Sequence, residues 1–171
     1  MSIPYNKQLR FKKSFKRKAL LSNDLKKALL IAFNEAKRNK IYVTPELLLY
    51  GLISQQNSIA AKLLSTTISE FRNNKNLTSV LISQRIRELN SKNFEEKNIL
   101  YTNKTNNFSS KLWDENASTP WLSPEVKEIL KKSFQSTLQS KRKIVVVNTK
   151  LILFELLSKE LIRELLVKVI N

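Results

Sequence analysis

The sequence predicts an all-α protein, and three observations support this prediction. The chain has 1 glycine and 4 prolines in 171 residues, too few for the many tight turns of a β-sandwich or barrel. Its hydrophobic share of 42% is enough for a packed core in a chain of this length. Apolar residues also recur at the spacing of one helix face in several separate segments. We expect no substantial sheet.

Residues 1–20 are predicted to be a basic N-terminal tail, with aromatic residues such as Phe11 and Phe15 between the cations. Blocks of like charge seldom pack, so a solvated tail is one interpretation. Weak polyanion binding and the end of a transit peptide are the alternatives. The sequence leaves this choice open.

Residues 21–90 are predicted to form a first helical repeat. Its first helix begins after Ser22, whose hydroxyl can accept hydrogen bonds from the free N–H groups of the first turn. The apolar stripe of this helix consists of Leu25, Ala28, Leu29, Ala32 and Ala36. An extended connector follows at 41–43.

The second helix of this repeat starts at Thr44 and Pro45, because proline at the first helical position loses no hydrogen bond. Glu46 then faces the positive end of the helix dipole. A third helix follows Ser58, and a fourth spans 78–89.

Residues 91–120 show no helical period and are predicted to be a linker, although a structureless connection of this length is uncommon in a compact protein. The segment contains Phe108 and Trp113, and Trp121 follows it directly. We expect these aromatic side chains to anchor parts of the linker to the helical body.

Residues 121–171 repeat the pattern of the first unit in the same order. Leu122-Ser123-Pro124-Glu125-Val126-Lys127 matches Leu21-Ser22-Asn23-Asp24-Leu25-Lys26, and the segment 147–157 matches 43–53. Two blocks repeated in the same order indicate a tandem duplication. The sequence therefore predicts a pseudo-twofold pair of four-helix units, the second truncated.

These residues resemble the N-terminal domain of the Clp ATPases, a double-repeat helical module of the Clp/Hsp100 chaperones. The resemblance covers 21–170 and depends on Glu35-Ala36-Lys37-Arg38, on Pro45-Glu46-Leu47-Leu48-Leu49-Tyr50-Gly51-Leu52-Ile53 and on Ser58-Ile59-Ala60-Ala61-Lys62-Leu63-Leu64. Two departures are clear. Leu47 stands at the family's histidine position, and no ATPase module follows, so the chain resembles a free-standing N-domain.

In that family the cap residue and the motif glutamate of each repeat form a small anionic pocket for cationic or phosphoarginine-bearing substrates. The resemblance thus implies Ser22 and Glu46 as substrate-binding residues, with Ser123 and Lys150 at the equivalent positions. Lys150 reverses the charge there. Roles as a helix cap and a dipole partner also explain Ser22 and Glu46 fully.

Composition excludes most catalytic chemistry. Without cysteine or histidine the chain has no disulfide framework, no thiol or imidazole catalysis and no usual zinc site. Phosphate-binding loops need several glycines, and the sequence has only Gly51. We expect no enzymatic activity, no cofactor and no bound metal.

The leading hypothesis is a non-catalytic accessory module that binds substrates or adaptors and partners a Clp ATPase or the Clp protease core. The alternative is a basic helical protein associated with RNA or ribosomes, because the net charge is +17. No apolar run approaches the roughly 18 residues of a membrane span. The lysine- and asparagine-rich composition suits the plastid stroma, with another organelle or a bacterial cytoplasm as alternatives.

Overall fold

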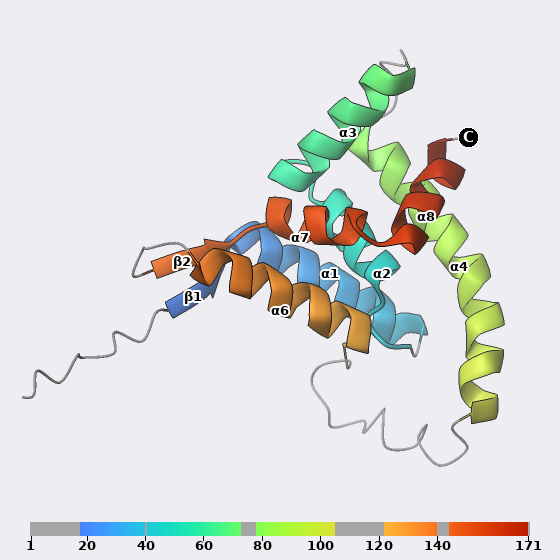
Figure 1. The fold of residues 1–171 in the computed structure, drawn as a ribbon. Coiled ribbons are helices and arrows are strands. Elements are labelled where there is room, and N and C mark those ends of the chain that lie inside the picture. Colours follow the sequence, from blue (N-terminus) through green and yellow to red (C-terminus); the bar gives the residue numbers. More distant parts are fainter. Residues whose placement is uncertain (1–17, 40, 73–77, 105–121, 140–143, 171) are drawn as a thin grey trace, which may run out of the picture.

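The computed structural model of the protein describes residues 18–39, 41–72, 78–104, 122–139 and 144–170. Helices make up 80% of the described residues, so the predicted all-α character is confirmed at this level (Figure 1). In chain order the elements are β1 (Lys18–Leu21), α1 (Asn23–Asn39), α2 (Pro45–Ser54), α3 (Ile59–Arg72), α4 (Ser79–Lys104), α6 (Pro124–Leu138), β2 (Ile144–Val147), α7 (Thr149–Leu157) and α8 (Glu160–Ile170).

The predicted helix starts are confirmed by their caps. The Leu25 N–H donates to Ser22 Oγ at 3.2 Å, and the Leu47 N–H donates to Thr44 Oγ1 at 3.4 Å. Each hydroxyl satisfies a first-turn donor that has no partner within its helix. Local chemistry alone therefore positions these ends.

A small parallel sheet is the first departure from the sequence prediction. β1 pairs with β2 in a register that places Leu21 opposite Val147. Residues 18–20, assigned to the tail, therefore belong to the fold. β2 is a run of β-branched residues, which favour extended backbone, and β1 takes its conformation from this partner.

The length of α4 is the second departure. The helix was predicted to end at Leu89, but it continues to Lys104, so the start of the predicted linker 91–120 is helical. No glycine or proline interrupts this stretch, and its lysine, glutamate and leucine residues favour helix even without an apolar stripe. Residues 105–121, with Phe108, Trp113 and Trp121, lie outside the described residues.

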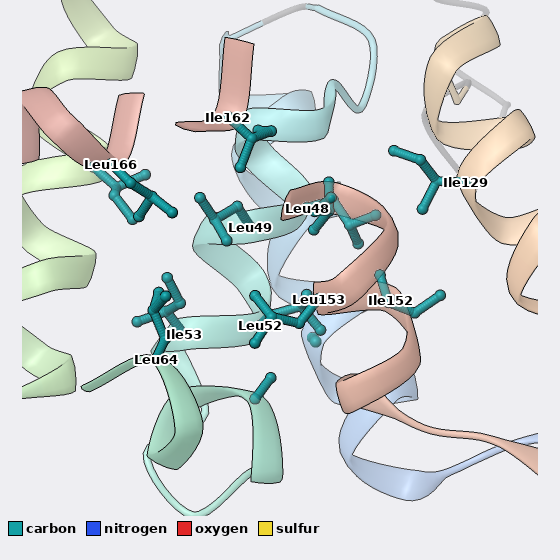
Figure 2. Packing of buried hydrophobic residues seen from close by; sticks show 14 of the residues in the cluster. Leu48, Leu49, Leu52, Ile53, Leu64, Ile129, Ile152, Leu153, Ile162 and Leu166 are labelled. Carbon is teal, nitrogen blue, oxygen red and sulfur yellow. The ribbon is translucent and has the colours of Figure 1, made fainter. Parts of the chain in front are cut away.

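Helix α2 lies at the centre of the core. Eight of its ten residues are buried, as expected for a helix that is apolar on all sides. Figure 2 shows its leucines between α7 and α8, which contribute Ile152, Leu153, Ile162 and Leu166. The same cluster includes Leu64 of α3 and Ile129 of α6. The two halves of the chain thus share one core.

The contact between α1 and α2 is unusually close at Gly51. A Cβ atom built there would lie 2.2 Å from the carbonyl oxygen of Ala28. Ala28 and Ala32 on α1 are themselves small and fully buried, which allows this approach. Gly51 is therefore required by packing, not by backbone conformation.

Polar contacts connect α4 with both halves of the chain. An Nη2 atom of Arg87 lies 2.8 Å from Oε1 of Glu35 on α1. Arg85 donates from Nη1 to the carbonyl oxygen of Val169 at 2.8 Å, near the C-terminus of α8. A cation at this position also complements the negative end of the α8 dipole.

Asn90 on α4 is buried at 2% exposure, and neither polar atom of its side chain has a hydrogen-bond partner among the described residues. We expect Asn90→Leu to raise the free energy of unfolding by about 1 kcal/mol, because it removes two desolvated polar groups at similar volume. Thermal and urea unfolding would measure this change. Asn34→Leu on the exposed side of α1 is the control, and a destabilised Asn90→Leu protein would contradict the prediction.

Candidate functional site

Two reciprocal junctions connect the halves of the chain where helices begin. The Ser22 N–H donates to the carbonyl oxygen of Val147 at 2.9 Å, and the Ser123 N–H donates to that of Val43 at 3.0 Å. Around them, β1 pairs with β2, and Val43 forms an isolated parallel bridge with Leu122. The start of α1 therefore lies beside the start of α7, and the start of α6 lies beside the start of α2.

This geometry places each candidate residue of one repeat near a candidate residue of the other repeat. Ser22 lies at the junction that leads into α7 and Lys150, whereas Ser123 lies at the junction that leads into α2 and Glu46. Ser22 and Glu46 are not brought together. Leu47, the neighbour of Glu46, packs with Ala32 and Ala36 on the C-terminal half of α1, about 15–20 Å along that helix from Ser22.

Glu46 is buried, with 4% of its surface exposed. Its position in the first turn of the central helix α2 explains this burial. Ser123 is also buried, at 6% exposure, and its Oγ accepts from the Val126 N–H at 3.3 Å. The junction near Ser123 and Glu46 is therefore buried, and it lies where the helices α6 and α2 begin. Its role in ligand binding stays a prediction.

The second junction presents a cation to solvent. Lys150 is exposed, and its Nζ atom lies 5.5 Å from the ring centroid of Phe154, which is 53% exposed. Such a cation–π contact at an exposed site is worth about 0.5–1 kcal/mol. The two candidate junctions therefore differ in charge, as the sequence shows, and also in accessibility.

Thr149 has a structural role that the sequence did not predict. Its side chain is buried, and its Oγ1 accepts from the Ala60 N–H at 3.4 Å. Ser58 Oγ accepts from the Ala61 N–H at 3.1 Å and donates to the Leu52 carbonyl oxygen at 3.1 Å. The N-terminus of α3 is thus capped from both halves of the chain. Sequence offers no local signal for a cap supplied 89 residues away.

Thr149→Val is expected to lower the free energy of unfolding by about 1–3 kcal/mol, because it leaves the buried Ala60 N–H without this acceptor at nearly unchanged volume. Urea unfolding would measure the loss. Thr67→Val is the matched control, since Thr67 Oγ1 donates to its own helix at an exposed site. Equal stabilities of the two variants would show that the bond from Ala60 contributes nothing.

An exposed cluster on the second half of the chain shifts two pKa values. Hydrogen bonds from Lys132 and Lys159 hold the pKa of Glu128 below its ordinary value, and Glu128 in turn raises the pKa of Lys132. The Glu128 carboxylate therefore contributes to stability at pH values above the ordinary glutamate pKa. This contribution is lost as the pH falls through the lowered pKa of Glu128. Solvent weakens all these contacts, so the cluster links α6 to the start of α8 without forming a binding site.

Two classes of site are not found in the part of the chain that the structure describes. It contains no group of three or more acidic, histidine or cysteine residues placed to hold a metal ion. Among the same residues, no helix combines the length and the apolar character needed to cross a bilayer.

No family model matches the chain, and no curated protein matches it.

Proposed function

We propose that the chain is a non-catalytic binding module of the Clp chaperone–protease system. Its partners would be a Clp ATPase or the Clp protease core, together with protein substrates or adaptors, in the plastid stroma. The observation that supports this proposal best is the reciprocal pair of junctions, Ser22 with Val147 and Ser123 with Val43. Each is made by equivalent positions of the two aligned sequence blocks.

The order of elements agrees with the proposed tandem repeat. Among the described residues a set of three helices occurs twice, as α1–α3 and as α6–α8, and α4 follows the first set. Gly51 and Glu155 occupy equivalent positions on α2 and α7. This difference fits a duplication after which α1 and α2 kept a close contact and the equivalent helices α6 and α7 lost it.

Recognition by such a module would be a matter of surface contacts. Of the four residues that the resemblance implies for binding, Ser22 and Lys150 lie at an accessible cationic junction, and Glu46 and Ser123 lie at a buried one. An anionic group is the ligand that Lys150 favours, because its ammonium donates charge-assisted hydrogen bonds to carboxylate or phosphate. The buried Glu46 offers no comparable access to a guanidinium group.

We therefore expect free arginine and an arginine-rich peptide to show no saturable binding in calorimetric titrations. Glu46→Gln should leave this result unchanged, whereas Lys150→Ala should weaken any phosphoarginine binding about tenfold. Saturable arginine binding that Glu46→Gln abolishes would show instead that the buried junction opens to ligands. Circular dichroism on each variant would establish that it is folded.

Affinity purification of the tagged protein from its source compartment tests the proposed function. Enrichment of Clp ATPase or protease subunits, identified by mass spectrometry and retained in high salt, is the expected result. Ribosomal RNA that is retained in high salt, without Clp subunits, would favour the alternative of an RNA- or ribosome-associated protein, since nonspecific phosphate contacts weaken steeply with salt. A tagged acidic protein of similar size is a suitable background control.

A further inference from the structure

We draw no further inference here: the strongest candidate, the exposed aliphatic face that Leu20, Ile144 and Val146 form on the β1–β2 sheet, carries none, because nothing among the described residues shows what covers it.

Discussion

Gly51→Ala is expected to lower the free energy of unfolding by about 3 kcal/mol or more, which is about 6–12 °C in Tm for a chain of this size. The added Cβ would lie 2.2 Å from the Ala28 carbonyl oxygen, so α1 and α2 must separate. Alanine has the better helix propensity by about 1 kcal/mol, but this gain is smaller than the loss from overpacking. Thermal unfolding followed by circular dichroism measures the net effect.

Glu155→Ala on α7 is the matched control for this substitution. Glu155 holds the position equivalent to Gly51 in the second sequence block, and it is half-buried. Its replacement should change stability by about 1 kcal/mol at most. A Gly51→Ala protein as stable as the wild type would mean that the two helices are not as close as the structure places them.

Leu52→Ala should lower the free energy of unfolding by about 3–5 kcal/mol, because Leu52 is fully buried in the core shared by both halves. Figure 2 shows Leu52 next to Leu153 of α7. The cavity would weaken both halves together, so unfolding should stay a single transition at lower urea concentration. Circular dichroism during urea titration measures the midpoint.

Leu30→Ala is the control for a leucine in solvent. Leu30 lies on α1 and is 58% exposed, so its truncation should change stability by about 0.5 kcal/mol at most. Two separate transitions in the Leu52→Ala protein would contradict a shared core, and they would indicate that each half unfolds independently.

Helix positions and helix starts were predictable because their causes are local. Ser22 and Thr44 accept hydrogen bonds from donors three residues later, and such spacings are visible in any sequence. The apolar stripe at Leu25, Ala28 and Ala32 likewise follows from helix periodicity, and all three residues are buried. The continuation of α4 to Lys104 was missed because a helix without an apolar stripe gives no periodic signal.

The sequence did not predict which candidate residues lie near one another in the structure. Ser22 and Glu46 belong to the same sequence block. However, Ser22 donates a hydrogen bond to Val147 of the second block, and Ser123 of the second block donates one to Val43 of the first. Burial of Glu46 follows from the central position of α2, which the long-range packing of α7 and α8 creates. Neither effect has a local cause.

The sequence by itself determined the helical class, the starts of most helices, the absence of thiol and imidazole chemistry and the similarity of the two blocks. These properties depend on composition and on spacings of three or four residues. Only the tertiary structure decided that Lys18–Leu21 is a strand, that Thr149 caps α3 and that Gly51 contacts Ala28. Each of these depends on contacts between residues that are far apart in the sequence. Such contacts leave no pattern of short spacings from which they could be predicted.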